Sequence, residues 1–276
     1  MYEGDNTQEE SNASLPDDGY RLANYAEEKG LQVPLLLDYG VDYEYNTKSV
    51  RMPYYLPDGT IQCTRYRGAN KRFWWKTKGT YSGKPTLYGL WRLEEYDDKF
   101  INLVEGESDT HSLWHMDLPG VGLPGASMWD DDKFAKYLER FKTIYVWQEQ
   151  DQGGTTLVNS LKDSSLKDKI RIVNAHHLDT EGDGFKDINE LWQAAPSLYQ
   201  PYAAGPKEFA LEQVGTALYN SVPIVDIVAE ENNQELQEAW ELCGDLARKP
   251  DIMRELLNVM NRYYLVGEDQ NASIVF

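Results

Sequence analysis

Carboxylate side chains follow two short apolar segments of the chain, at the point where each segment ends. Glu105 and Asp109 follow the first segment, and Glu149 and Asp151 follow the second. A short apolar run bounded by turn residues is typical of a buried strand. Because ligands bind beyond the carboxyl ends of parallel strands, these four side chains are expected around one crevice.

A divalent cation is the chemistry that such a group of acids favours. Carboxylates gathered this closely raise one another's pKa values and repel unless a cation lies among them. Ligand sets made only of oxygen favour Mg²⁺ or Mn²⁺ over zinc. The alternative is that these residues are solvated loop acids in a very acidic protein. The repetition of acids after both predicted strands favours the metal site.

The residues of this pattern resemble the TOPRIM domain, which is shared by DnaG-type primases, phage and plasmid primase-helicases, topoisomerases and some nucleases. That family carries Glu-Gly after its first strand and Asp-x-Asp-x-x-Gly after a later one. The matching residues here are Glu105-Gly106 and Glu149-Gln150-Asp151-Gln152-Gly153-Gly154. Glu149 replaces the first Asp of the family's pair, and its extra methylene moves the carboxylate by about 1.5 Å.

A third match favours the primases within this family. The segment Lys186-Asp187-Ile188-Asn189 is similar to a Lys-Asp-x-Asn that primase-type TOPRIM domains carry and topoisomerases generally lack. The resemblance implies that Asp187 approaches the metal and that Lys186 approaches a phosphate. The alternative is an ordinary helix start with Asp187 as its cap.

The resemblance implies an α/β TOPRIM fold, in which a mostly parallel, Rossmann-like central sheet has helices on its flanks. It also implies that Glu105 and Asp151 are catalytic. The residues expected to hold Mg²⁺ or Mn²⁺ are Glu105, Asp109, Glu149, Asp151 and Asp187.

Positive charge is concentrated in one part of a strongly acidic chain. The formal net charge is −19, which by itself argues against binding a phosphate backbone. From residue 59 to residue 93, however, there is no Asp or Glu, and basic residues alternate with aromatic ones. This mixture suits single-stranded nucleic acid, whose phosphates and bases it can bind together. The residues expected to bind nucleic acid or phosphate are Arg65, Arg67, Lys71, Arg72, Trp74, Lys76, Lys78 and Lys186.

Composition excludes several other classes of protein. Two cysteines are too few for a disulfide framework or a cysteine-rich zinc site. No run reaches the roughly 18 apolar residues of a membrane helix, and the acidic N-terminus does not have the character of a signal peptide. A cytoplasmic protein with no membrane partner is therefore expected.

Local patterns predict the elements that would position these side chains. Asp58-Gly59 between two β-rich runs predicts a hairpin, in which Arg65 and Arg67 share one strand face. Further strands are expected at 71–76, 87–92 and 169–174, and helices at 108–116, 130–141 and 155–161. The sequence thus predicts an acidic mobile tail at 1–18, a small basic β-rich module at 19–95, the TOPRIM domain at 96–200, and a helical region at 201–276 that could lead into a helicase domain.

The function that this resemblance implies is primer synthesis on single-stranded DNA during replication of a mobile element, phage or plasmid. Its partners would be the template strand, nucleoside triphosphates and a replicative helicase in cis or in trans. Two alternatives remain open at this point: a TOPRIM nuclease that uses the same carboxylates, and a catalytically inert DNA-binding module of a replication protein.

Overall fold

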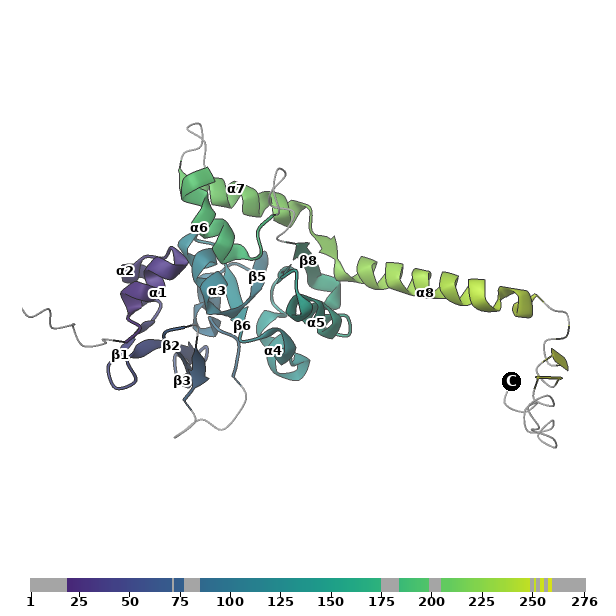
Figure 1. The fold of residues 1–276 in the computed structure, drawn as a ribbon, viewed down its shortest axis with the longest axis horizontal. Coiled ribbons are helices and arrows are strands. Elements are labelled where there is room, and N and C mark those ends of the chain that lie inside the picture. Colours follow the sequence, from purple (N-terminus) through teal and green to yellow (C-terminus); the bar gives the residue numbers. More distant parts are fainter. Residues whose placement is uncertain are drawn as a thin grey trace, which may run out of the picture. The chain divides into compact units, whose positions relative to one another are not determined.

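The structure is a computed structural model with two sheets (Figure 1). It describes residues 19–70, 72–76, 85–174, 184–198, 205–248, 251, 254–255 and 258–259. One unit of the chain ends at Ile224, and a second begins at Val225. Both sheets belong to the first unit. The acidic segment 1–18, which was expected to be a tail, lies outside the described residues.

Residues 19–70 and 72–76 form what we call the front module. Its sheet is an antiparallel meander in the order β1-β2-β3-β4. The predicted hairpin is confirmed, because β2 and β3 pair around a turn in which Gly59 has a φ of +81°. The elements of the module are α1 (Leu22–Lys29), α2 (Val33–Asp38), β1 (Asp42–Glu44), β2 (Ser49–Tyr55), β3 (Ile61–Arg67) and β4 (Phe73–Trp75).

The strand expected at residues 87–92 does not form. Tyr88 makes only an isolated antiparallel bridge with Gly122, and a 3-10 helix, η1 (Leu90–Glu95), follows. Gly89 separates the two with a φ of +96°, which ends the extended conformation. A Cβ on Gly89 would lie 2.8 Å from the Trp114 ring, so glycine also lets the chain pass close to that ring. The apolar alternation of this segment therefore reflects a buried turn.

The second sheet has the order β6-β5-β7-β8-β9, in which only β9 is antiparallel to its neighbour. This arrangement confirms the expected α/β fold with a mostly parallel central sheet and flanking helices. Its elements are β5 (Phe100–Glu105), α3 (Gly106–His115), β6 (Gly120–Leu123), η2 (Ala126–Met128), α4 (Asp131–Leu138), β7 (Thr143–Gln148), α5 (Gln152–Leu161), η3 (Lys167–Lys169), β8 (Ile170–Asn174), α6 (Ile188–Leu198), α7 (Pro206–Tyr219) and β9 (Val222–Pro223).

Alternating side chains of the parallel strands bury both faces of this sheet. Val104, Trp147 and Val173 join one apolar cluster with residues of α3, α6 and α7. Their chain neighbours on the other face, such as Leu103 and Val146, are buried as well. Apolar runs without polar alternation are what a strand covered on both faces requires. The helix α7, in the region expected to form a helical tail, thus packs against the sheet.

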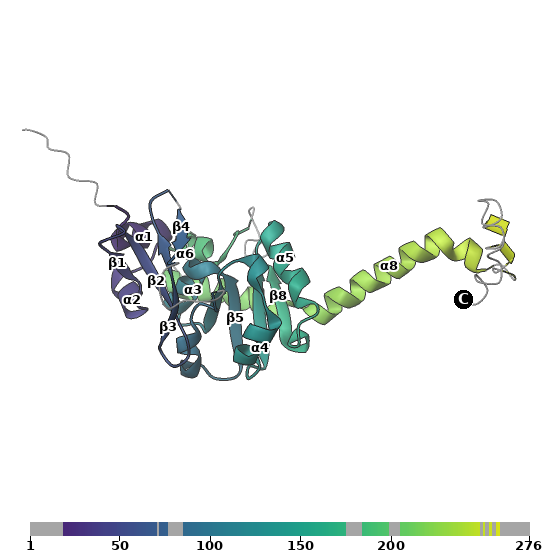
Figure 2. The same ribbon diagram turned by 90° about the horizontal axis from the view of Figure 1, so that it is seen from below.

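The front module lies beside α3 in both views (Figure 1, Figure 2). Its cluster of buried residues includes Trp114 of α3, and the Trp192 indole of α6 donates a hydrogen bond of 2.8 Å to the Gly30 carbonyl. The α3 helix therefore separates the front module from the parallel sheet and contacts both.

The last described helix, α8 (Ile224–Ala247), has exposed apolar side chains at Leu236, Trp240 and Leu242. Among the described residues, no helix combines the length and the apolar character that a membrane crossing requires.

Candidate active site

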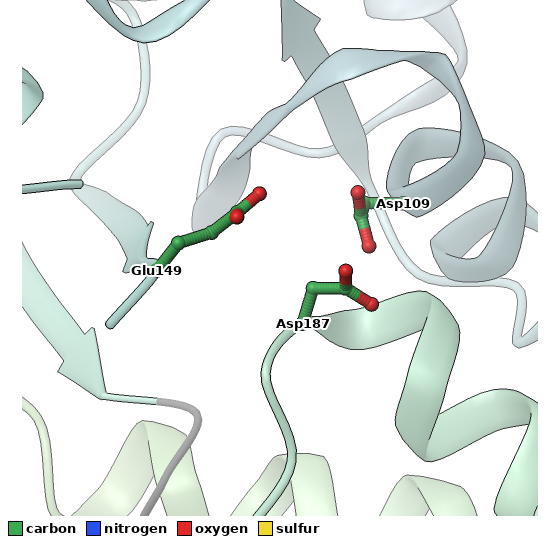
Figure 3. Close-up of side chains that lie close together, drawn as sticks. All are labelled: Asp109, Glu149 and Asp187. Carbon is green, nitrogen blue, oxygen red and sulfur yellow. The ribbon is translucent and has the colours of Figure 1, made fainter. Parts of the chain in front are cut away.

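Three carboxylates from three separate elements meet beyond the carboxyl end of the parallel sheet (Figure 3). Asp109 belongs to α3, Glu149 follows β7, and Asp187 lies directly before α6. One oxygen of each lies within 4.8 Å of the others. We call these three residues the acid cluster. The expectation that the strands before Glu105 and Glu149 are adjacent and parallel is confirmed, because β5 pairs with β7.

Backbone amides of α6 hold two members of the acid cluster. A carboxylate oxygen of Asp109 accepts a hydrogen bond of 2.8 Å from the amide of Asn189. Asp187 caps the same helix, because its side chain accepts 2.8 Å from the amide of Glu190. Two interpretations of Asp187 were open from the sequence: a helix cap and a residue near a metal. The structure makes these two roles compatible. One oxygen can bind the helix while the other is available to a ligand.

The position of Glu149 depends on a glycine five residues later. A Cβ on Gly154 would lie 2.1 Å from the carbonyl oxygen of Glu149 and 2.8 Å from its amide nitrogen. Only glycine lets the first turn of α5 approach the end of β7 so closely. Asp151 begins this helix, and its side chain accepts a hydrogen bond of 3.0 Å from the Gly154 amide. Asp151 is outside the acid cluster, so the structure gives it the role of a helix cap, and its role as a metal ligand stays a prediction.

Glu105 ends β5 beside the acid cluster and has a strongly perturbed carboxyl group. Its Oε1 atom is buried and has no hydrogen-bond partner among the described residues. Burial, together with the negative charges of Glu149 and Asp151, raises the pKa of Glu105 to about 7, against the opposing effect of Lys186. The glycine of the Glu-Gly pair is needed for the turn into α3, because Gly106 has a φ of +79°.

Electrostatics at this site favour a bound cation. Burial raises the pKa of Asp109 well above its ordinary value, and the charges of Asp187 and Glu149 add to the effect. Lys186 is the only basic residue among those that line the pocket in the described part of the chain. Its ammonium lies 2.8 Å from Oε2 of Glu149, and this hydrogen bond raises the pKa of Lys186. The pocket is thus lined by one basic side chain and by four acidic ones, Glu105, Asp109, Glu149 and Asp187. This all-oxygen donor set fits Mg²⁺ or Mn²⁺.

Two of the arginines expected to bind nucleic acid lie in ion pairs inside the protein. Arg65 and Arg67 share one face of β3, as predicted, and both lie over the Phe73 ring. Arg65 donates to the buried carboxylate of Glu107 at 3.2 Å, and Arg67, only 5% exposed, pairs with Glu28. Both arginines thus have partners within the fold. Whether they also contact nucleic acid stays a prediction.

Three further residues expected to bind nucleic acid, Arg72, Trp74 and Lys76, lie in or beside β4 of the front module. The guanidinium of Arg72 lies 5.7 Å from the centroid of the Trp74 ring, and that ring stacks on Tyr66. Lys76 is exposed. An aromatic ring beside a cation is suited to stacking a base and binding its phosphate. Lys71 and Lys78 lie outside the described residues, so their contribution stays a prediction.

A second polar centre lies on α3, where the helix faces the front module, and it was not predicted from the sequence. Glu107 accepts hydrogen bonds from the Tyr54 hydroxyl at 2.5 Å and from Arg65. One turn later the His111 ring is hydrogen-bonded to the hydroxyls of Tyr25 at 3.0 Å and Tyr88 at 2.8 Å. One signal could have indicated this: alternation along β3 places Arg65 on the same face as Cys63, an apolar and buried residue.

Comparison with solved structures places this fold among primase catalytic cores. The chain is similar to the primase fragment of the bacteriophage T7 primase-helicase, with 20% identity, a TM-score of 0.50, and 68% of this chain and 72% of that chain covered. It is similar to the Aquifex aeolicus primase, a structure of the zinc-binding and RNA polymerase domains, with 14% identity, a TM-score of 0.53, and 90% and 68% covered. A DnaG primase catalytic domain bound to single-stranded DNA gives 13% identity, a TM-score of 0.52, and 90% of each chain covered.

No protein-family model matches the sequence, and no curated protein matches it either. The likeness is therefore one of fold. The chain has the fold of DnaG-type and phage primase cores, which is the fold that the resemblance of its acid and glycine motifs to the TOPRIM domain implied.

Proposed function

We propose that this protein is a metal-dependent nucleotidyltransferase that synthesises primers on single-stranded DNA. The observation that carries the proposal is the acid cluster of Asp109, Glu149 and Asp187, at the carboxyl end of the sheet in a primase-type fold. The similar solved structures are primases, and this favours primer synthesis as the reaction. The acid cluster provides carboxylates that can support that reaction.

The acid cluster would hold Mg²⁺ or Mn²⁺. When bound, the metal supplies positive charge to the attacking hydroxyl and to the triphosphate of the incoming nucleotide. Asp109 and Asp187 are held in place for this task by amides of α6. Glu149 is positioned by the close approach of α5 at Gly154. Each ligand is thus oriented by backbone atoms, which keeps the site ordered before a cation arrives.

Glu105 is the residue proposed to act as general acid and base. A carboxyl group whose pKa is about 7 is partly ionised at neutral pH, so it can accept a proton from a hydroxyl and return it. Its buried Oε1 has no partner in the described part of the chain, which leaves it available to a reacting group or a metal-bound water. Asp151 is proposed to assist from the start of α5.

The proposed substrates are nucleoside triphosphates and a single-stranded template. Lys186, at the edge of the acid cluster, is suited to a phosphate of the nucleotide once a metal has replaced it beside Glu149. Arg72, Trp74 and Lys76 are suited to the strand. We further propose that the protein serves a phage, plasmid or other mobile element and acts with a replicative helicase. The likeness to a fragment of a primase-helicase supports this.

A nuclease that uses the same carboxylates is the second candidate function. The acid cluster favours it as much as it favours a primase, because both reactions displace an oxygen at phosphorus with help from a metal. An inert DNA-binding module is the third candidate. The pairing of Lys186 with Glu149 supports it, because an internal cation already neutralises part of the site.

Primer synthesis with labelled nucleotides on single-stranded DNA, in the presence of Mg²⁺ or Mn²⁺, tests the proposal. Wild type should synthesise primers, and Asp187→Asn should not, although asparagine keeps the oxygen that caps α6. Calorimetric titration with Mn²⁺ should show saturable binding to wild type alone. Strand cleavage in place of synthesis would establish the nuclease. Absence of both activities together with absence of Mn²⁺ binding would establish the inert module.

A further inference from the structure

A second hollow lies between the front module and α4. It has a volume of about 160 Å³ and shares no lining residue with the pocket at the acid cluster. Gln62 of β3 lies on one side, and Lys133, Phe134, Lys136 and Tyr137 of α4 lie on the other. None of the residues assigned so far to metal, nucleotide or strand takes part in it.

The charge of this hollow is opposite to that of the chain. No carboxylate is among the residues that line it, although the protein carries a formal net charge of −19. Lys133 pairs with Asp130 at the start of α4. Lys136 is exposed and has no ion pair among the described residues. A lysine without a carboxylate partner, beside a hollow without acids, favours an anionic ligand.

Two further side chains give the hollow the means to bind a heterocycle. The Gln62 Oε1 atom is buried and has no hydrogen-bond partner in the described part of the chain. Leaving a buried acceptor unpaired is costly, so a ligand with an N–H or O–H donor would be stabilised here. The half-buried Tyr137 ring offers a stacking surface, and the Lys136 ammonium lies 5.0 Å from its centroid.

We propose that this hollow binds one nucleotide of a single strand of DNA, with its phosphate on Lys136 and its base against Tyr137 and Gln62. A nucleotide unit combines the anion, the ring and the N–H donor that the three side chains require. The proposal deepens the proposed function, because the strand bound here would be the template.

The size of the hollow favours one unit of a strand over a free nucleotide. Pockets that enclose a whole small molecule have volumes of roughly 300–1,000 Å³, whereas this one has about 160 Å³. A single nucleotide would leave much of its surface in water and bind weakly. A strand gains affinity from its other contacts, so a shallow pocket is sufficient for one of its units.

The test is the affinity of the full chain for a short fluorescein-labelled oligothymidylate, measured by fluorescence anisotropy at several salt concentrations. Lys136→Glu should weaken binding about tenfold and Gln62→Ala about threefold. Lys136→Ala should lower the slope of log K against log salt by about 0.7, the value for one phosphate of a single strand. After ultraviolet irradiation of a 4-thiothymidine strand, the adduct should be found on the α4 peptide that contains Tyr137.

Lys99→Glu is the matched control. It makes the same charge change at an exposed lysine directly before β5, at the opposite end of that strand from Glu105. If Lys99→Glu weakens binding as much as Lys136→Glu, the effect is one of general charge and the proposal is wrong. Unchanged affinity in both Lys136→Glu and Gln62→Ala would also overturn it. If thymidine monophosphate saturates the protein at the same concentrations as the oligothymidylate, the hollow binds a free nucleotide, and the proposal that it binds a strand is wrong.

These outcomes are separate from those of the proposed function. Anisotropy measures strand binding whether or not primers are made. Asp187→Asn should bind the strand as wild type does while it loses synthesis. A wild type that binds strands through Lys136 but makes no primer would remove the proposed function and retain this site.

Discussion

The α3 helix carries two polar centres that differ in how their charges are compensated. On the side of the front module, Glu107 is surrounded by the Arg65 guanidinium and the Tyr54 hydroxyl. Asp109, two residues after Glu107, and Glu105, two residues before it, face other carboxylates. The pKa values of Asp109 and Glu105 are therefore raised. At Glu107, groups of the protein itself balance the negative charge. The arrangement around Asp109 and Glu105 has an excess of negative charge that a ligand is needed to balance.

This difference separates structural from functional acids better than burial does. Glu107 and Asp109 are almost equally buried, at 4% and 5% exposed. Burying an ion pair is tolerated when its hydrogen bonds are satisfied, whereas an unpaired buried charge is costly. A fold that keeps Asp109 near Asp187 and Glu149 therefore gives up stability at that site, which is common where a ligand binds.

The sharpest test of the comparison is Asp109→Asn, which removes a charge and keeps the shape. Because several kcal/mol of transition-state stabilisation come from a bound metal, activity should fall about 10³-fold. The melting temperature in EDTA should rise, because the raised pKa of Asp109 means that its ionised form destabilises the fold. Asp168→Asn, at an exposed position of η3, should change neither quantity. A lower melting temperature in EDTA would contradict the view of Asp109 as an uncompensated charge.

Breaking the compensated centre around Glu107 should lower stability and leave metal binding almost unchanged. Arg65→Met leaves the buried Glu107 carboxylate without its cation, which should lower the free energy of unfolding by about 3–5 kcal/mol. Urea unfolding followed by tryptophan fluorescence measures this. The double variant Arg65→Met/Glu107→Gln should recover most of the loss, and Mn²⁺ affinity per folded molecule should stay within about twofold of wild type. A double variant as unstable as the single one would show that Arg65 acts through its packing on Phe73.

Gly154→Ala tests whether backbone packing positions the acid cluster. The new Cβ would overlap the Glu149 carbonyl oxygen, so we expect a loss of about 1–3 kcal/mol in stability and about tenfold in Mn²⁺ affinity. Gly153→Ala is the matched control. Its Cβ would meet nothing closer than 3.0 Å, at Oδ1 of Asp151, so its effect should be much smaller. Equal effects of the two substitutions would mean that the position of Glu149 does not depend on Gly154.

The smallest expected effect is on the pH dependence of stability without metal. The pKa of Glu105 is raised from 4.5 to about 7 in the folded protein, so the folded state binds more protons than the unfolded state between these values. Stability should therefore fall as pH rises from about 4.5 to about 7, by roughly 1 kcal/mol after allowance for solvent screening. Glu105→Gln should make this fall smaller, as should saturating Mn²⁺. A fall as large in Glu105→Gln as in wild type would contradict the raised pKa of Glu105.

Much of the fold could be predicted because the relevant signals are local. The hairpin depends on Asp58-Gly59, and the parallel strands before Glu105 and Glu149 were recognised from apolar runs that end at acids and glycines. The segment at 87–92 was predicted wrongly as a strand for the same reason. Its apolar residues are buried, but Gly89 turns the chain into a 3-10 helix against Trp114.

The sequence by itself determined which segments form strands and that acids follow them, because periodicity and turn residues act within a few positions. It also determined that Glu105 and Glu149 lie at one edge of a sheet. Only the tertiary structure decided how the acids are used. The resemblance implied one ligand set that included both Asp151 and Asp187, and the tertiary structure distinguishes them: Asp187 joins Asp109 and Glu149, whereas Asp151 caps α5. It likewise decided that Arg65 pairs with Glu107, 42 positions away. A side chain's role depends on its partners, and partners from distant segments are fixed only by packing.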